Sequence, residues 1–276
     1  GCMPSKLLIA AAEAAHASRL APAFGVNTGT TEIDGRAVMA RVRRERDRFV
    51  GFVLESVEGI AQEHRLRGKA RFLDAHTLAV GGDARVRADR IVIATGSKPV
   101  VPGIPGLEHI DYLTSDTLWS ITDRPEKLVV LGGGPIGCEL TQAFSRLGSD
   151  VTLVEMAGQL LGREDEDAAN AVLKALSEGD GVNVALSTKA VRVEGEGQGG
   201  TLVCEQDGKE VRYDFDRLLR AGADKVGVNT AAIARPEPPA RGTRPSEAPS
   251  AGPGAPRECS AWRTAPRRPP SRCRTR

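Results

Sequence analysis

Three glycines follow a short apolar run and could hold the phosphates of a dinucleotide. Gly132, Gly134 and Gly137 form the pattern G-x-G-x-x-G directly after the β-branched stretch Lys127–Leu131. The first glycine of such a pattern permits a tight turn, the second lets the backbone approach a pyrophosphate, and the third allows a helix to pack closely on a strand. Glu155, 23 residues after Gly132, could accept hydrogen bonds from a ribose diol and would repel a 2′-phosphate. The spacing therefore predicts a site for NAD rather than NADP.

A cysteine and a lysine near the amino end could carry redox chemistry. Cys2 precedes Pro4 and Lys6, and an Ala/Leu-rich run continues to about Arg19. Proline is favoured in the first turn of a helix, so we expect a helix to begin here. The positive end of its dipole and the nearby lysine would stabilise a thiolate at Cys2. A small buried cysteine at a helix start is the alternative interpretation.

The glycine pattern lies within a predicted strand–helix–strand unit. Lys127–Leu131 reads as a buried parallel strand, the following helix runs to about Leu147, and Gly148 ends it. Asp150–Val154 is the second strand, and Glu155 follows it directly. A glycine-rich loop without a ligand is the alternative, but all four parts in register favour dinucleotide binding.

Further elements are predicted on both sides of this unit. Asp34 is a plausible N-cap for a helix over residues 35–63, in which apolar residues recur at helical spacing. Residues 90–94 (RIVIA) read as a buried strand that Thr95-Gly96-Ser97 ends. The remaining predictions are short strands at residues 68–72, 77–80, 85–87, 182–185, 190–194, 201–206, 210–213 and 215–219, and a helix at 164–178.

Composition indicates an ordinary globular protein followed by a segment of different character. Residues 235–276 hold ten arginines and three acids, a net charge of +7, so the rest of the chain sums to −5 within the total of +2. This balance argues against a nucleic-acid binder, and a non-specific basic tail is the weaker alternative. No apolar run approaches the roughly 18 residues that would span a membrane. Five scattered cysteines without a C-x-x-C pair favour a cytoplasmic location and no metal site.

Three motifs together resemble one family of flavoenzymes. GCMPSK, RIVIATGSKPVVPGIPGL and VVLGGGPIGCEL…VTLVE occur in that order within about residues 1–219. They are similar to the class I pyridine nucleotide–disulfide oxidoreductases. The resemblance implies an α/β fold with two Rossmann-like domains for FAD and NAD(P), the first incomplete, together with small antiparallel meanders. The corresponding divisions are a partial FAD-binding domain at 1–121, an NAD-binding domain at 122–222, and a chimeric or disordered Pro/Arg-rich tail at 223–276.

The resemblance also assigns roles to individual residues. In this family two electrons pass between a dithiol and NAD through a disulfide and FAD. Cys2 resembles the flavin-side cysteine, Lys6 the lysine near flavin N5, and Glu139 its ion-pair partner. A cation beside N5 stabilises the anionic reduced flavin, and a carboxylate keeps the lysine charged. The expected cofactor-binding residues are Lys6, Ala70, Ala94, Thr95, Gly96, Gly132, Gly133, Gly134, Pro135, Ile136, Gly137, Glu139, Glu155 and Ala190.

Within the family, Pro-Ser-Lys after the cysteine looks more like dihydrolipoyl dehydrogenase or mercuric reductase than glutathione reductase. We therefore expect a dihydrolipoyl dehydrogenase-like enzyme with a lipoamide-like substrate and, at full length, a homodimer. A mercuric reductase-like enzyme and a non-catalytic NAD-binding fragment are the alternatives. The family's FAD-binding glycine pattern, first cysteine and catalytic histidine–glutamate pair do not occur in this sequence. The chain is thus expected to be truncated, to retain FAD weakly and to turn lipoamide over negligibly.

A second resemblance begins where the first ends. Residues 220–237, RAGADKVGVNTAAIARPE, are similar to one βα unit of the cyclase subunit of imidazole glycerol phosphate synthase. That subunit is a TIM barrel, and one βα unit cannot form a barrel, so no function is carried over. Together with the Arg/Pro-rich sequence that follows, this segment suggests a chimeric gene product.

Overall fold

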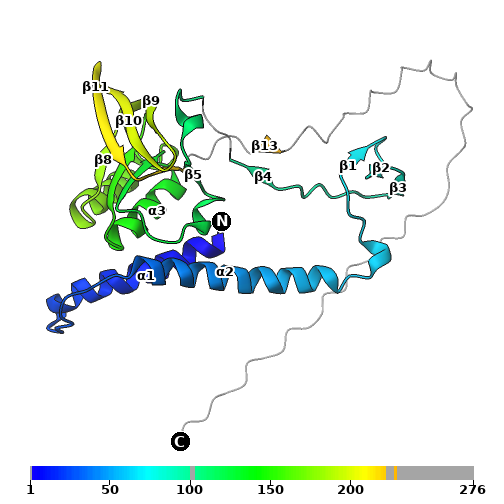
Figure 1. Ribbon diagram of the computed structural model, residues 1–276, viewed down its shortest axis with the longest axis horizontal. Coiled ribbons are helices and arrows are strands. Elements are labelled where there is room, and N and C mark those ends of the chain that lie inside the picture. The colour runs from blue at the N-terminus through cyan, green and yellow to red at the C-terminus, as the bar shows by residue number, and fades with distance from the viewer. Residues whose placement is uncertain (1, 100–102, 222–226, 229–276) are drawn as a thin grey trace, which may run out of the picture. The chain divides into compact units, whose positions relative to one another are not determined.

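The computed structural model describes residues 2–99, 103–221 and 227–228 (Figure 1). By its internal contacts the chain divides into residues 1–236 and 237–276, and every described residue lies in the first unit. No helix among the described residues is long and apolar enough to cross a membrane.

A five-stranded parallel sheet forms the centre of the described fold. Its order is β5-β12-β6-β7-β8, and each neighbouring pair runs in parallel. From the central strand β6 the chain passes through α3, β7 and α4 to β8 on one side, and it later returns to β12 on the other side. The order reverses between β6 and β12, and in such sheets ligands bind at the carboxyl ends of the strands beside this reversal. The elements are β5 (Leu113–Thr114), β6 (Lys127–Leu131), α3 (Pro135–Arg146), β7 (Asp150–Val154), α4 (Glu166–Lys174), β8 (Asn183–Ala185) and β12 (Arg217–Arg220).

Both faces of the sheet are buried, and alternate residues of β6 face opposite cores. Leu128 and Val130 belong to one hydrophobic core, and Val129 and Leu131 belong to the other. This explains the continuous apolar run in the sequence, because a parallel strand covered on both faces needs no polar alternation. The predicted bounds of β6 and β7 are confirmed to the residue.

The first core is covered by helices. Helix α1 (Cys2–Leu20) and α3 pack against one another, and α1 also packs against α2 (Gly35–Glu58). They bury Leu8, Met39 and Phe144 completely. Short 3₁₀ turns follow α1 and α2 at η1 (Ala21–Phe24) and η2 (Gln62–His64), and two more follow β4 (Ser97–Lys98) and β5 at η3 (Leu107–His109) and η4 (Leu118–Ser120). The π-helical turn η5 (Ala175–Gly179) extends α4.

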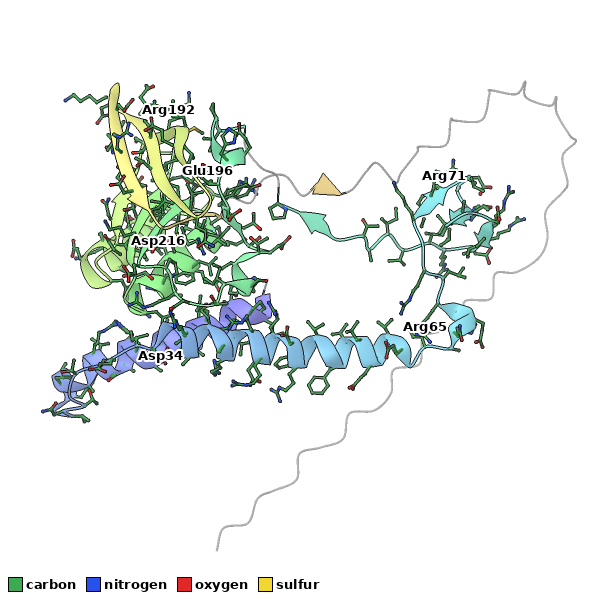
Figure 2. The ribbon with its side chains drawn as sticks, in the orientation of Figure 1. Asp34, Arg65, Arg71, Arg192, Glu196 and Asp216 are labelled. Atoms are coloured by element: carbon green, nitrogen blue, oxygen red, sulfur yellow. The ribbon has the colours of Figure 1, made fainter. Side chains whose placement is uncertain are left out.

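Helix α2 begins as predicted and ends earlier. Asp34 accepts a hydrogen bond from the Ala37 amide at 2.9 Å, so it caps the helix start (Figure 2). The helix ends at Glu58 rather than at residue 63. Its first half buries Met39 and Val42, whereas the expected core residues of its second half are exposed: Phe49, Phe52, Val53, Val57 and Ile60.

An antiparallel meander covers the second core. Strands β9 (Thr188–Glu196), β10 (Gly199–Gln206) and β11 (Lys209–Phe215) pair in the order β11-β10-β9 (Figure 1). The hairpin between β10 and β11 turns at Asp207 and Gly208, both with positive φ, as type I′ turns require. The meander predicted from the sequence is confirmed, with longer strands than expected.

The segment before the sheet departs from expectation at one point. A small antiparallel sheet, β1-β2-β3 (Ala70–Phe72, Thr77–Val80 and Ala84–Arg87), agrees with the predicted short strands. Residues 90–94, predicted as a buried strand, form no strand, and Val92 is 89% exposed. Among the described residues nothing pairs with this run, and an apolar strand is stable only when neighbours complete its hydrogen bonds.

Little of the carboxyl-terminal segment is described. Gly227–Val228 forms β13, which pairs antiparallel with β4 (Ser97–Lys98). The predicted disorder and chimeric origin of residues 223–276 otherwise fall outside the described residues and stay predictions.

Candidate dinucleotide and redox site

The glycine loop is built as the sequence pattern predicts. Gly132 follows β6 with φ of 109°, a conformation that glycine adopts readily, and its amide donates to the Val154 carbonyl at 2.9 Å. A Cβ on Gly137 would lie 1.9 Å from the Gly132 carbonyl oxygen, so only glycine lets α3 approach the strand this closely. A Cβ on Gly134 would meet nothing within 4 Å, so the backbone there is open to an incoming group.

The amino end of α3 faces this open space. Gly134 is the N-cap and has no side chain to satisfy the first amides, and Pro135 occupies the first turn. The first-turn N–H groups of a helix have no intrahelical acceptor and carry partial positive charge. An anion such as a pyrophosphate is therefore favoured at this position.

Glu155 lies at the carboxyl end of the neighbouring strand. Its two carboxylate oxygens accept hydrogen bonds from the amides of Gly133 at 2.6 Å and Ala157 at 2.8 Å. Gly133 also packs tightly, since a Cβ there would lie 2.6 Å from Leu160. A carboxylate has about four lone-pair positions, so this one can still accept from ribose hydroxyls. The side chain is thus held beside the loop before any ligand binds.

A buried thiol lies beneath the same loop. Cys138 Sγ donates to the Gly133 carbonyl at 3.4 Å, and the residue is 7% exposed. Burial, and to a lesser degree the negative charge of Glu155, raises the pKa of this thiol to about 11. Cys138 is therefore a packing residue that helps to hold the loop, and nothing in its sequence neighbourhood indicated this.

Lys6 and Glu139 form an ion pair between α1 and α3. The Lys6 Nζ lies 2.7 Å from Glu139 Oε1, and the side chains are 68% and 31% exposed. Glu139 comes one helical turn after Pro135, so the pair stands near the amino end of α3. The structure brings together the two residues that the family resemblance paired, while their role toward a flavin stays a prediction.

The other expected cofactor residues are more scattered. Ile136 is 38% exposed at the start of α3, and Ala190 lies on β9, packed against the second core. The residues expected along FAD are exposed and belong to neither core: Ala70, Ala94, Thr95 and Gly96. Cys2 begins α1.

A second polar group between α1 and α3 was missed. Arg146 bonds to both Glu13 and Asp180, two turns along the helices from the first ion pair. The signal was present as opposite charges seven residues apart in each helix, Lys6 with Glu13 and Glu139 with Arg146. It could be read only by aligning the helices, and the sequence does not give that alignment.

The described residues fit NAD better than they fit FAD. The loop, the helix end and Glu155 provide an open approach, anion-binding amides and a ribose acceptor. For FAD, the described residues supply Lys6 and an exposed extended segment, without an enclosing cavity around them.

Comparisons with known proteins identify the family. The sequence matches the pyridine nucleotide-disulphide oxidoreductase family over residues 1–222. It is 36% identical over 234 residues to a mercuric reductase of Lysinibacillus sphaericus and 37% identical over 249 residues to one of Streptomyces lividans. It is also 30% identical over 257 residues to a leghemoglobin reductase of Vigna unguiculata. These alignments cover 83%, 83% and 85% of this chain.

A solved structure gives the same result. The fold is similar to the Cu(II) complex of the HOCl-induced flavoprotein disulfide reductase RclA from Escherichia coli, with a TM-score of 0.64 and 25% identity over 83% of this chain. The match covers 48% of that chain, and the three relatives are covered over 42%, 51% and 48% of their lengths. The chain thus spans about half the length of the proteins it resembles.

Proposed function

We propose, from the premise that this chain belongs to the pyridine nucleotide-disulphide oxidoreductase family, that it binds NAD(H) and exchanges two electrons between the nicotinamide and a sulfur centre. Proteins of this family are oxidoreductases that use FAD and a pyridine nucleotide. Bound FAD would supply the two-electron carrier between the nicotinamide and the sulfur.

One juxtaposition carries the proposal. The phosphate-binding turn of α3 and the Glu139 side chain that holds Lys6 are about one helical turn apart. A dinucleotide anchored at Gly134 and Glu155 would extend over the carboxyl ends of β6 and β12, where the strand order reverses. Lys6 pairs with the Glu139 carboxylate and presents its side-chain nitrogen near the same helix end. The arrangement supports nucleotide binding and charge stabilisation at one place.

The choice of nucleotide is tested at Glu155. Glu155→Ala should weaken NADH binding at least about tenfold, since hydrogen bonds to a charged acceptor contribute about 1.5–3 kcal/mol each. Glu155→Arg should shift the preference toward NADPH. Nucleotide fluorescence titrations measure both affinities, and Glu126→Ala, at the opposite end of β6, is the control. Unchanged NADH affinity in Glu155→Ala would remove the NAD assignment.

The electron acceptor is proposed from chemistry and relatives together. The Cys-Met-Pro-Ser-Lys motif is compatible with a lipoamide-like dithiol, the substrate first expected. The name shared by several relatives favours mercuric ion, a soft cation that thiolates bind strongly. We give the mercuric ion precedence and keep the dithiol as the second candidate.

A visible spectrum and an NADH oxidation assay separate the possibilities. The purified chain should bind NADH and retain FAD weakly. If flavin is retained, faster NADH oxidation with mercuric ion and excess thiol than with lipoamide supports the first candidate, and the reverse order supports the second. A colourless protein that binds NADH and gives no turnover with added FAD would refute enzymatic electron transfer and leave a nucleotide-binding module.

A further inference from the structure

Helices α1 and α3 carry two ion pairs in the same alignment. Lys6 on α1 meets Glu139 on α3, and Glu13 on α1 meets Arg146 on α3, each pair separated by 133 positions in the sequence. Since both helices advance by seven residues between the pairs, they run in the same direction, and the pairs lie about 10 Å apart. The charges are reversed between them, with the cation on α1 in one pair and on α3 in the other.

Arg146 is held by a second carboxylate, Asp180, in addition to Glu13. Its Nε donates to Asp180 Oδ1 at 2.7 Å, and its side chain is 14% exposed. The Asp180 side chain is 3% exposed and also accepts a hydrogen bond from Gln142 Nε2 at 2.7 Å, while His16 Nδ1 lies 4.0 Å from its Oδ1. The second arm of the guanidinium reaches Glu13 across the helix contact. A planar guanidinium that bonds two carboxylates has little freedom to move, so Arg146 is a fixed point for α1.

Shape fixes the position of α1 along α3 only in part, although Leu8 is buried in the same core as Phe144. The helix is rich in alanine, and the helices approach one another through small side chains, with Ala12 1% and Ala143 2% exposed. Alanine side chains make shallow ridges, so they oppose sliding less than large interlocking side chains do. A cavity of about 40 Å³ remains between the two ion pairs.

The charges oppose sliding in both directions. A shift of α1 by seven residues one way would bring Lys6 against Arg146, and a shift the other way would bring Glu13 against Glu139. Either shift replaces two attractions by a repulsion, and like charges at helical-neighbour distance are destabilising. Only the observed alignment satisfies both pairs.

We propose that Arg146 is a positioning residue. Through its bond to Glu13 it fixes the position of α1 along the axis of α3, and so it holds Lys6 against Glu139. Its importance for electron transfer rests on the function proposed above, but the positioning itself does not require a bound cofactor. The consequence is that Lys6 is placed by a residue two helical turns away from it.

Zero-length cross-linking of the full chain tests this directly. A carbodiimide joins the Lys6 amine to the Glu139 carboxylate only while they are in contact, and peptide mass spectrometry measures the yield. Glu13→Gln removes the negative charge that Arg146 contacts on α1 and leaves the Arg146–Asp180 pair intact. The yield of the Lys6–Glu139 cross-link should therefore fall several-fold. The Lys174–Glu178 pair within α4, 3.9 Å apart, is the internal control and should cross-link as before.

Two variants of Arg146 and one control variant complete the test. Arg146→Gln should lower the yield as Glu13→Gln does, and Arg146→Lys, which keeps the charge but loses the fork, should be intermediate. Glu58→Gln, an exposed neutralisation on α2, should change nothing. An unchanged yield in Glu13→Gln with folding intact would overturn the proposal, even if Arg146→Gln unfolds. The assay contains no nucleotide or flavin, so failure at Glu155 would refute the proposed function and leave this result standing.

Discussion

Gly134 and Gly137 lie three residues apart and have opposite surroundings. A Cβ at Gly137 would collide with backbone at 1.9 Å, whereas one at Gly134 would project into open space. Gly137→Ala should therefore destabilise the protein by about 2 kcal/mol or more, because neither strand nor helix can yield easily. Gly134→Ala should keep its melting temperature and lose at least about tenfold in NADH affinity, because its methyl group occupies the pyrophosphate approach.

Thermal unfolding and NADH titration of the two variants separate these effects. If both alanines weakened binding with equal loss of stability, the division between a packing glycine and a ligand-facing glycine would be wrong.

The two buried thiols predict how stability changes with alkaline pH. Burial raises the pKa of Cys138 and Cys204 from 9.0 to about 11. The unfolded chain then releases these protons at lower pH than the folded chain, so stability falls as pH rises from about 9 through 11. At pH near 8 both thiols should react slowly with an alkylating reagent until the protein unfolds.

The Cys138→Ala and Cys204→Ala variants should each flatten the alkaline decline in melting temperature. Rapid alkylation of Cys138 in the folded chain, followed by mass spectrometry, would show that its surroundings are open.

At the scale of single residues, local spacing was informative where function depends on the backbone. The glycine pattern and Glu155 could be predicted because a strand, a turn and a helix fix their geometry within 24 residues. The environment of Cys138 could not, since its buried thiol depends on the Gly133 carbonyl and on a carboxylate from another strand.

Among the elements, the outer face of the meander is held by a ring of charges. Arg192 on β9 and Arg212 on β11 lie on either side of Val203 on β10, and Val203 is fully buried (Figure 2). Both arginines bond to Glu194 and Glu210, with Arg192 Nη2 at 2.8 Å and 3.2 Å from them. The arginine stems cover the valine while their charged ends remain in water.

Arg212→Gln should produce a small loss of thermal stability that disappears at about 1 M salt, where surface charges are screened. Hydrogen bonds from Arg212, then Arg192, lower the pKa of Glu194 and Glu210 below 4.5. Their contribution is therefore present above this pH and is lost as pH falls through the lowered values. In Arg212→Gln the pKa values of both carboxyl groups should lie nearer to 4.5, so the acid decline should be shallower and end at higher pH; exposed Arg163→Gln is the control.

Strand prediction succeeded or failed according to the neighbours available. β6 and residues 90–94 have similar apolar, β-branched sequences, yet only β6 is paired on both sides. Propensity describes how well side chains fit a half-buried pleated surface, and it does not supply that surface. Among the described residues, the 90–94 run therefore forms no strand and is mostly exposed.

For the whole molecule, the second half of α2 presents apolar residues to solvent. Seven large hydrophobic side chains in this half of the helix and just after its end at Glu58 are 41–62% exposed: Phe49, Val50, Phe52, Val53, Leu54, Val57 and Ile60. Contiguous apolar surface of this kind promotes association. We expect the purified chain to bind a hydrophobic dye and to self-associate with rising concentration, and the Phe52→Lys/Val53→Lys double variant to reduce both.

Dye fluorescence and light scattering measure these properties, and circular dichroism checks that the helix persists. Val42→Lys, in the buried half of the same helix, should instead unfold the protein. Equal dye binding by the wild type and the double variant would place the exposed apolar surface elsewhere.

Family membership was predictable at this scale because three separated motifs occur in a fixed order. The substrate was not, since a motif that faces the cofactor says little about the electron acceptor. Nor did the sequence indicate that α1 and the first half of α2 share a core with the five-stranded parallel sheet, because helical periodicity identifies a buried face and not its partner.

The parallel alignment of α1 and α3 has an electrostatic consequence. Extending the offset of 133 positions toward the amino end of α3 places the Cys2 backbone level with Pro135, the first residue of α3. The start of α3 carries a partial charge of about +0.5, because its first amides have no acceptor within the helix. This positive potential lowers the free energy of any anion brought near it, whether a thiolate on α1 or a pyrophosphate at the glycine loop. How strongly the start of α3 acts on Cys2 therefore depends on the alignment that the two ion pairs hold.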